Sequence, residues 1–255
     1  MPEGDSYTLA AERMRPVLVG RTITSVTGAA PDVRRLSGSI TGAEVTEVRT
    51  LGKHLMIDLA NGLTIHIHLG MPGRFQVGRL PAAEGAAVRL ALNTDAGSAS
   101  VLAAPTVEVD RRKVVDHELR RVGPDLLADE FDWDRFRHQA AVYPAERTVS
   151  DFLLDQRVMA GIGNVYKCET LFLEGIEPRR TMDRIDPAQR DSLARRARRL
   201  MLANARRSRR ATTGDGGFWV YQRAGRACRR CRTEILSAWI GEPARITYWC
   251  PTCQT

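Results

Sequence analysis

Apolar residues recur at helical spacing in the first twenty residues of the chain. One stripe consists of Leu9, Ala10, Met14, Val17 and Leu18 and ends before Gly20. A repeat of three to four residues places such side chains on one face of a helix. Asp5 and Ser6 precede the stripe, and both residue types accept hydrogen bonds from the free N–H groups of a first helical turn. The pattern therefore predicts a helix that begins just after Pro2 and is capped by Asp5 or Ser6.

The apolar period changes to two between Thr22 and about Val109. Two neighbouring runs alternate apolar with other positions: Leu55, Ile57 and Leu59, then Leu63, Ile65, Ile67 and Leu69. Such alternation is typical of half-buried strands. Asn61-Gly62 between the two runs is a strong hairpin signal, because both central residues of a type I′ turn need positive φ. Similar short runs continue to Val109, and together they predict an antiparallel sandwich.

The strand pattern ends near Val122-Gly123-Pro124-Asp125, and helical spacing returns from Phe131. The acidic stretch between them is typical of a connection between domains. The fold class expected from this order is α+β. Its expected parts are a β-sandwich domain with the first helix over 1–122, a linker over 123–130, a helical domain over 131–222 and a terminal segment over 223–255.

Two further helices are expected around the tight turn Ala160-Gly161-Ile162-Gly163. One covers 150–159, and the other covers 164–174 and is closed by Gly175. An arginine-rich helix is expected from 187 to about 207, because its leucine, alanine and methionine residues share one helical face.

The chain has 255 residues, of which 43% are hydrophobic and 6% aromatic. This length accommodates two modest cores. The sequence has no apolar run near the roughly 18 residues of a membrane span and no signal-peptide pattern. A cytoplasmic protein is expected, associated with the nucleoid if bacterial, and its five cysteines are then interpreted as ligands, nucleophiles or core residues before disulfides.

Positive charge is concentrated toward the end of the chain. Residues 176–255 contain 18 Lys+Arg and 7 Asp+Glu, a net charge of +11, whereas residues 1–175 contain 20 and 23, a net charge of −3. A basic segment of this kind is a candidate for binding a polyanion. The 38 cations include only three lysines, Lys53, Lys113 and Lys167. Arginine suits bidentate phosphate binding, but a GC-rich genome would produce the same bias.

Four cysteines form two C-x2-C pairs separated by 18 residues: Cys228, Cys231, Cys250 and Cys253. This spacing predicts one structural Zn²⁺ per chain, bound by four thiolates with no open position. Two disulfides are the alternative. The spacer contains a hairpin pattern, 235–240 followed by 245–249, that the metal would close. The fifth cysteine, Cys168, lies at helical spacing with apolar residues and is interpreted as a core residue.

Motifs in several parts of the chain form a recognisable set. They are Met1-Pro2-Glu3-Gly4, Gly52-Lys53, Leu154-Asp155-Gln156, Ala160-Gly161-Ile162-Gly163-Asn164 and Tyr248-Trp249-Cys250-Pro251. Together the chain resembles the formamidopyrimidine-DNA glycosylase and endonuclease VIII family, and it is closer to the endonuclease VIII branch. The resemblance implies a β-sandwich, a helix-two-turn-helix domain and a β-hairpin zinc finger. It also implies base-excision repair, in which an oxidised base is removed and the abasic site is then cut.

The resemblance assigns catalysis to Pro2, Glu3 and Lys53. Removal of Met1 would leave Pro2 with a secondary α-amine, and such groups have a pKa of about 7.7 to 8.0, against about 10.4 for lysine. Its attack on the sugar C1′ gives an iminium that cannot lose a proton to become neutral, and this electron sink drives β,δ-elimination. Glu3 would act as the proton donor, and Lys53 would contact a phosphate or the leaving base. Taken alone, the three residues are also compatible with an ordinary second residue, a first-turn acid and a solvated turn lysine.

The resemblance assigns DNA binding to Met71, Asn164 and Arg245. Asn164 and Arg245 would donate to phosphates near the lesion, whereas Met71 would fill the gap that an extruded base leaves. The alternatives are a plain helix cap for Asn164, one more surface arginine for Arg245 and a core methionine for Met71.

Two departures bear on specificity. Ser6 stands where the family usually has a second acid, and that role is not transferred to Asp5. Residues 93–110 contain no Arg-Phe-Gly cluster of the purine-specific branch, which favours oxidised pyrimidines as substrates. His66 and His68 lack acidic or cysteine partners in the sequence and are interpreted as structural or supporting residues.

The expected partner is damaged DNA, either double-stranded or with single-stranded or bubble regions. No membrane is expected as a partner, and the protein is expected to be a monomer. A catalytically inactive DNA-binding protein on the same scaffold is the main alternative, and a retained Met1 would favour it. A zinc-ribbon RNA-binding module is a second alternative, which the low aromatic content disfavours.

Overall fold

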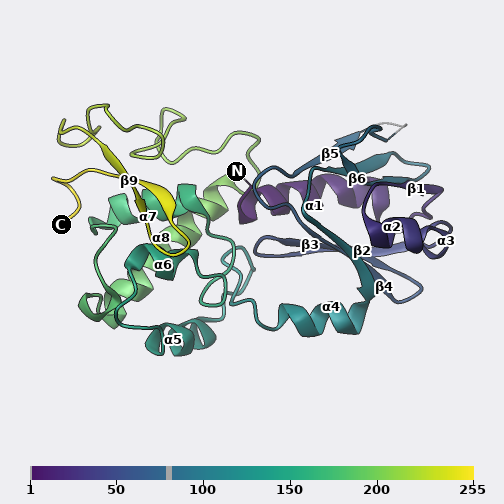
Figure 1. Ribbon diagram of the computed structural model, residues 1–255, viewed down its shortest axis with the longest axis horizontal. Helices are drawn as coiled ribbons and strands as arrows, with labels where there is room; N and C mark the ends of the chain where they lie inside the picture. The colour runs from purple at the N-terminus through teal and green to yellow at the C-terminus, as the bar shows by residue number, and fades with distance from the viewer. Residues whose placement is uncertain (1, 79–81) are drawn as a thin grey trace. The chain divides into compact units, whose positions relative to one another are not determined.

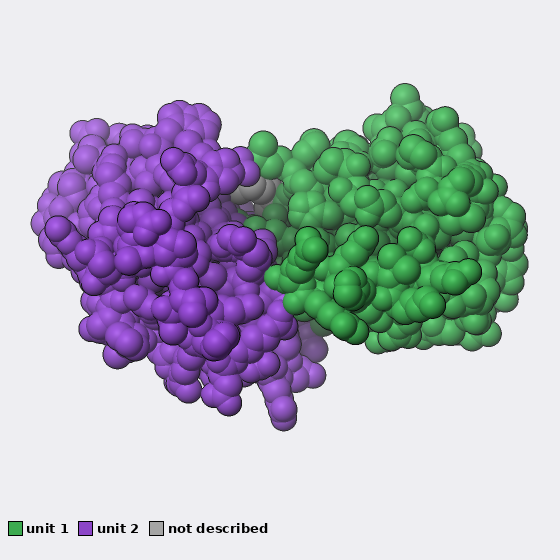
Figure 2. Space-filling model, turned by 60° about the horizontal axis from the view of Figure 1, so that its bottom comes forward, with its two compact units in different colours: residues 1–121 green, residues 122–255 purple. Residues whose placement is uncertain are grey.

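The computed structural model describes residues 2–78 and 82–255, so Met1 lies outside the described residues. The chain divides into two compact units, residues 1–121 and residues 122–255 (Figure 2). Each unit is described by itself. No helix among the described residues is long and apolar enough to cross a membrane.

Unit 1 contains the two four-stranded sheets of a sandwich (Figure 1). One sheet has the order β1 (Ser25–Thr27), β6 (Val88–Asn93), β7 (Ser98–Leu102) and β5 (Arg74–Gly78); the other has β2 (Val45–Leu51), β3 (His54–Leu59), β4 (Leu63–His68) and β8 (Thr106–Arg111). All neighbouring strands pair antiparallel. The alternating side chains of these strands are buried in one apolar cluster, because successive residues of a strand face opposite sides of its sheet.

The first helix, α1 (Gly4–Leu18), contacts strands of both sheets and buries its apolar stripe against them. Its cap differs from the prediction. Glu3 is the N-cap with extended backbone, whereas Ser6 lies in the first turn and its hydroxyl accepts from the Glu3 N–H at 3.4 Å. The Asp5 carboxylate accepts instead from the Ser6 N–H at 2.9 Å. The helix therefore begins two to three residues earlier than a cap at Asp5 or Ser6 requires.

The hairpin between β3 and β4 forms where the sequence predicts it, but its turn is of another type. Asp58 pairs with Thr64, and Gly62 alone has the positive φ of +83° in the turn, whereas Asn61 does not. The Asn61 side chain instead accepts from the Leu63 N–H at 3.2 Å. This local hydrogen bond stabilises a wider turn than type I′, because an asparagine side chain mimics a backbone turn.

Three helices of unit 1 were not predicted: α2 (Pro31–Arg35), α3 (Ser37–Ile40) and α4 (Arg112–Leu119). All are short. In α4 only Val115 and Leu119 are buried, so its apolar face is too narrow to give a clear periodic signal in the sequence.

Unit 2 is mainly helical. Its elements are α5 (Trp133–Ala141), α6 (Val149–Leu154), α7 (Asn164–Glu174), the 3-10 helix η1 (Met182–Arg184), α8 (Pro187–Asn204), β9 (Leu236–Ile240) and β10 (Arg245–Trp249). Helix α7 has the predicted bounds, and Gly175 ends it with φ of +71°. Both strands of the predicted hairpin are present and pair antiparallel.

Two helices of unit 2 end earlier than predicted. Helix α6 stops at Leu154 rather than Met159, because the Asp155 carboxylate accepts from the Arg157 N–H at 2.9 Å and turns the chain. Helix α8 stops at Asn204 rather than about Arg207. There the Asn204 amide bonds both the N–H and the carbonyl of Ala211, which holds the chain in a reversed path.

Helix α7 is the centre of unit 2. Every residue from 164 to 172 is buried, and the helix contacts α6, α8 and β10. A helix that is buried on all sides fixes the position of each side chain along it. Burial therefore fixes the side chains along α7, including that of Asn164 at its start.

Candidate nucleic-acid interface and metal centre

The first site residue, Pro2, immediately precedes the cap of α1. Pro2 is half-buried, whereas the Glu3 side chain is fully buried. The Ser6 hydroxyl holds the Glu3 backbone N–H, so the serine that replaces the expected acid supports the backbone beside Pro2. This contact assigns Ser6 a local structural role. A half-buried Pro2 next to a buried carboxyl group is a suitable arrangement for an amine nucleophile with a proton donor.

Lys53 lies in the two-residue turn between β2 and β3 and is half-buried. Beside it, three histidines lie in contact. His54 Nδ1 is 2.9 Å from His66 Nε2, and the His54 ring centroid lies 5.1 Å from that of His66 and 5.2 Å from that of His68. His66 and His68 belong to this cluster, and His66 Nδ1 also lies 3.5 Å from the Glu108 carboxylate, so the interpretation that His66 lacks an acidic partner was wrong. His54 was missed, although the hairpin register places residues 54, 56, 66 and 68 on one face.

The histidine cluster is held in its neutral form. Burial, and next the neighbouring His66 and His68, lower the pKa of His54 to about 3, and Lys53 adds to this shift. Burial and then Lys53 also lower the pKa of His68. Burial lowers the pKa of His66, although Glu108, whose carboxylate is 3.5 Å from His66 Nδ1, opposes the shift. The imidazoles beside Lys53 are therefore uncharged, and they do not compete with the lysine ammonium group for an anion.

Met71 lies in the turn between β4 and β5, and 63% of its surface is exposed. This exposure excludes the core alternative. Gly70 has φ of +58°, and a Cβ there would lie 2.8 Å from the Pro105 ring, so only glycine fits this turn. The turn thus presents a flexible apolar side chain to solvent, a suitable shape for insertion between bases.

Asn164 is the first residue of α7, but it is not its cap, because Gly163 occupies that position without a side-chain hydrogen bond. The Asn164 Nδ2 donates to the Ile246 carbonyl of β10 at 2.7 Å. Its Oδ1 is buried and has no hydrogen-bond partner among the described residues. The turn before α7 is shaped by Gln156, whose amide bonds the backbone of Leu154, Ile162 and Gly161.

Arg245 begins β10, one residue before the carbonyl that holds Asn164. It is half-buried and pairs with Ile240 across the hairpin. The structure therefore brings Asn164 and Arg245 together within unit 2. Their amide and guanidinium groups are donors of the kind that bind a phosphate.

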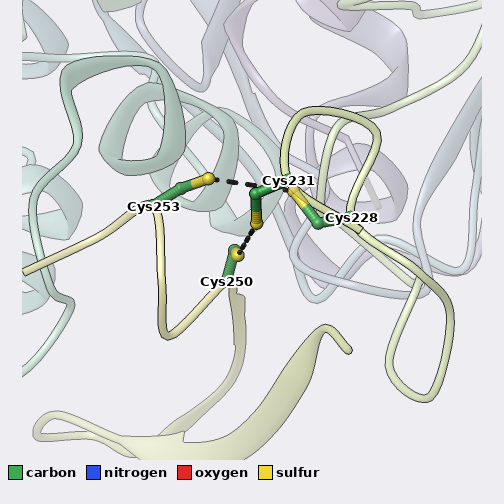
Figure 3. Close-up of side chains that lie close together, drawn as sticks. All are labelled: Cys228, Cys231, Cys250 and Cys253. Carbon is green, nitrogen blue, oxygen red and sulfur yellow. Dashed lines mark hydrogen bonds between the residues drawn. The ribbon is translucent and has the colours of Figure 1, made fainter. Parts of the chain in front are cut away.

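The four cysteines converge as predicted (Figure 3). Their sulfur atoms all lie within 4.8 Å of one another, with Cys231 and Cys250 3.4 Å apart and Cys228 and Cys253 4.0 Å apart. A tetrahedral Zn²⁺ with bonds of about 2.3 Å needs sulfur atoms about 3.8 Å apart. All four are free cysteines, which argues against the disulfide alternative. The cluster fits a structural metal site.

The thiols of the cluster differ in acidity. Hydrogen bonds from Thr233 lower the pKa of Cys231 to about 6. Burial raises the pKa of Cys250 and Cys253, and the neighbouring sulfur atoms add to it. A bound metal ion would oppose this rise, because metal binding deprotonates its cysteine ligands. Cys168 is buried in the apolar cluster beside two of the ligands, in agreement with the core interpretation.

Glu169 on α7 is a buried residue that sequence reasoning missed. Its carboxylate accepts from the backbone N–H groups of Trp219, Val220 and Tyr221 at 2.8 to 2.9 Å, and from the Thr212 hydroxyl. Three successive N–H groups that converge on one anion form a nest. The carboxylate therefore fixes the segment between α8 and the cysteine cluster to the central helix.

Both units match domains of one known enzyme family. Residues 1–122 match the formamidopyrimidine-DNA glycosylase N-terminal domain, and residues 122–214 match the H2TH domain of the same enzymes. The chain belongs to the formamidopyrimidine-DNA glycosylase family. Endonuclease 8 2 of Mycobacterium tuberculosis is 38% identical over 263 residues and all of both chains. The DNA-(apurinic or apyrimidinic site) lyase Nei2 of Mycolicibacterium smegmatis is 38% identical over all of this chain and 99% of its own.

Solved structures agree with the fold. Lactococcus lactis Fpg in complex with DNA containing an abasic site has a TM-score of 0.84 and 23% identity, and the match covers 99% of each chain. The comparisons confirm the family, the α+β fold and the assignment to bifunctional glycosylase and lyase enzymes of this family.

Proposed function

We propose that this chain is a base-excision-repair glycosylase that removes oxidised bases from DNA and cuts the resulting abasic site by β,δ-elimination. The observation that carries the proposal is the start of α1, where a half-buried Pro2 directly precedes the fully buried carboxyl group of Glu3. Once Met1 is removed, Pro2 has a secondary α-amine at this position, and such an amine can act as a nucleophile. Membership of the formamidopyrimidine-DNA glycosylase family supports the same chemistry.

The proposed reaction assigns a role to each of the site residues in unit 1, Pro2, Glu3, Lys53 and Met71. The Pro2 nitrogen forms a bond to the sugar C1′, and the base departs with its bonding electrons and takes up a proton. Glu3 protonates the sugar ring oxygen as the ring opens. The iminium withdraws electrons, so that loss of a C2′ proton expels the 3′ phosphate, and loss of a C4′ proton from the unsaturated product then expels the 5′ phosphate. Lys53 binds a phosphate or the departing base, and Met71 fills the gap in the stack.

Oxidised pyrimidines are the proposed substrates. The strands β6, β7 and β8 are joined by short turns, Thr94–Gly97 and Ala103–Pro105. These turns offer neither the length nor the Arg-Phe-Gly residues for filling the gap opposite a purine lesion. Two curated relatives are named endonuclease 8 2 rather than formamidopyrimidine-DNA glycosylase, which supports the same preference.

Trapping tests the nucleophile directly. Intact-mass analysis first establishes whether Met1 is removed, and borohydride reduction on DNA with one abasic site then captures the iminium. Wild-type protein without Met1 is expected to form the adduct. Pro2→Gly should lose most strand cleavage, about 100-fold or more, and keep DNA binding. Val142→Ala, which truncates an exposed residue of unit 2, serves as the control and should retain the adduct.

Two outcomes contradict the mechanism. Unchanged cleavage by Pro2→Gly would sink the assignment of the nucleophile. A wild-type protein that lacks Met1 and binds DNA but gives no adduct would be the inactive DNA-binding protein considered above.

We infer that the cysteine cluster binds one zinc ion, because four thiolates at near-tetrahedral spacing are the donor set that zinc prefers. Cys250→Ser should lose the metal and weaken DNA binding, since β10 carries Arg245 and ends one residue before Cys250. Metal content by mass spectrometry and binding by anisotropy check this. One equivalent of zinc in Cys250→Ser would contradict the ligand set; Cys168→Ser, the control, should retain the metal.

A further inference from the structure

The loop that carries Met71 closes on a single residue. Leu69 follows the end of β4, beyond the last pair of either ladder that this strand forms. The Leu69 carbonyl accepts from the Gly73 N–H at 3.0 Å. A Cβ on Gly73 would lie 2.3 Å from the Leu69 carbonyl oxygen, so only glycine allows this close approach. Residues 69–73 therefore form a compact loop, the Met71 loop, with Met71 at its middle.

Tyr7 contacts the chain on both sides of the Met71 loop. Its hydroxyl accepts from the Leu69 N–H at 2.8 Å and so supplies a partner to a backbone group that lies beyond the strand ladders. Its ring lies edge-on to the ring of Phe75, the second residue of β5, with the centroids 5.5 Å apart. One buried side chain of α1 thus holds the start of the loop and the strand that follows it.

Tyr7 also lies close to the proposed nucleophile along α1. It is one helical turn after Glu3, and the side chains of both residues are buried. The helix packs on strands of both sheets, so it cannot shift relative to them without breaking the apolar core of unit 1. A rigid element therefore connects Pro2 and Glu3 to the Met71 loop.

Met71 depends on this support because its own side chain is mostly exposed. With 63% of its surface exposed, the side chain has little packing that could fix its direction. A flexible side chain can be placed accurately only when its backbone is held, and holding it before binding lowers the entropic cost of insertion. Leu69, the base of the loop, is 1% exposed, so without the Tyr7 hydroxyl its N–H would be buried and would lack this acceptor.

We propose that Tyr7 is a positioning residue that holds Met71 at a fixed place relative to Pro2 and Glu3 during insertion into the base stack. This inference rests on the proposed function, in which Met71 fills the gap that an extruded base leaves. The extruded nucleotide has to reach Pro2 while Met71 occupies its former place, so the geometry of DNA sets the distance between the two residues. Tyr7 keeps that distance constant, because it belongs to the helix that follows Pro2 and bonds the loop that carries Met71.

Binding to an uncleavable abasic-site analogue tests the proposal without requiring catalysis. Burial raises the pKa of Tyr7, so its hydroxyl is uncharged and Tyr7→Phe removes no charge. On a duplex, Tyr7→Phe should weaken binding about fivefold, the effect of losing one hydrogen bond. In the Met71→Ala background the same change should cost less than about twofold, because no insertion remains to be positioned.

A single strand and a distant tyrosine provide the controls. On a single strand with the same analogue, Tyr7→Phe should cost less than about twofold, because there is no base stack to fill. Tyr143→Phe, which removes the hydroxyl of a half-buried tyrosine in unit 2, should bind both oligonucleotides as the wild type does.

A fluorescent base reports insertion directly. 2-Aminopurine opposite the analogue becomes brighter when an inserted side chain unstacks it. The wild type at saturation should raise this fluorescence, and Tyr7→Phe and Met71→Ala should both raise it less. Phe75→Leu, which removes the ring contact on the other side of the loop, should act in the same direction.

Several results would overturn the inference. Additive losses from Tyr7→Phe and Met71→Ala would show that the two residues act independently, and equal losses on duplex and single strand would make Tyr7 a purely structural residue. A lower melting temperature of Tyr7→Phe with wild-type binding and fluorescence would have the same meaning. Wild-type affinity and fluorescence in Met71→Ala would remove Met71 from the stack, and with it this role of Tyr7.

The two proposals fail separately. If the wild type forms no borohydride adduct, the glycosylase and lyase function fails, whereas an adduct together with additive losses in the binding cycle sinks this inference alone.

Discussion

At the scale of single residues, His54 makes the stability of unit 1 sensitive to pH. Burial and the adjacent histidines lower the pKa of His54 to about 3. The unfolded chain takes up a proton at this residue below about pH 6.5, whereas the folded chain does not. The contribution of His54 is therefore fully present above pH 6.5 and is lost as the pH falls from 6.5 toward 3.

The expected loss for this one group is about 1 to 2 kcal/mol between pH 7.5 and pH 5. Urea unfolding of the wild type and of His54→Gln at both pH values measures it. The variant should lose less stability on acidification than the wild type, and His138→Gln, at an exposed histidine of unit 2, should behave as the wild type. Identical pH dependence in His54→Gln and the wild type would contradict the assignment.

The sequence identified site residues where a motif or spacing carried the signal. The cysteine spacing predicted the cluster, and the glycine turn before Asn164 predicted the start of α7. His54 was missed because its place in the histidine cluster depends on the register of two strands. The hairpin turn, had it been used to align β3 with β4, would have placed His54 on the face of His66.

At the scale of elements, Glu169 determines the path of the segment 212–221. The fold of this segment was not predictable, because it contains no periodic pattern and depends on one buried carboxylate that lies 43 or more positions before it along the chain. The bounds of α6 and α8 were missed for a similar reason. The side chains of Asp155 and Asn204 form hydrogen bonds with backbone groups beyond the ends of the two helices. Whether such side chains bond these groups or allow the helix to continue depends on the surrounding packing.

Glu169→Gln should loosen this segment and cost about 1.5 to 3 kcal/mol, because an amide offers one oxygen where the carboxylate accepts with two. Hydrogen exchange should become faster at the amides of Trp219 and Val220, and the melting temperature should fall. Glu177→Gln is the matched control, since it breaks only a partly exposed pair with Arg179, worth at most about 1 kcal/mol. Unchanged exchange at Trp219 in Glu169→Gln would show that other contacts hold the segment.

At the scale of the whole molecule, positive charge is concentrated in the part of the chain that contains Arg245 and the cysteine cluster. The net charge of +11 on residues 176–255 coincides with α8, the loop after it and the cysteine cluster, whereas residues 1–175 have a net charge of −3. Much of this arginine is used within the protein. Arg190 and Arg198, for example, donate to backbone carbonyls at 2.6 to 3.1 Å. The net charge therefore overestimates the number of cations that bind a phosphate.

The salt dependence of binding measures how many cations do bind. Each phosphate contact to duplex DNA contributes about −0.9 to the slope of log K against log salt concentration. Arg245→Ala should make the slope less steep by about this amount and weaken binding equally on damaged and undamaged duplexes, because a phosphate contact reads no base. Arg35→Ala, which removes an exposed arginine paired with Asp32 in unit 1, should leave the slope unchanged. A loss confined to one lesion, or an unaltered slope, would place Arg245 away from the DNA backbone.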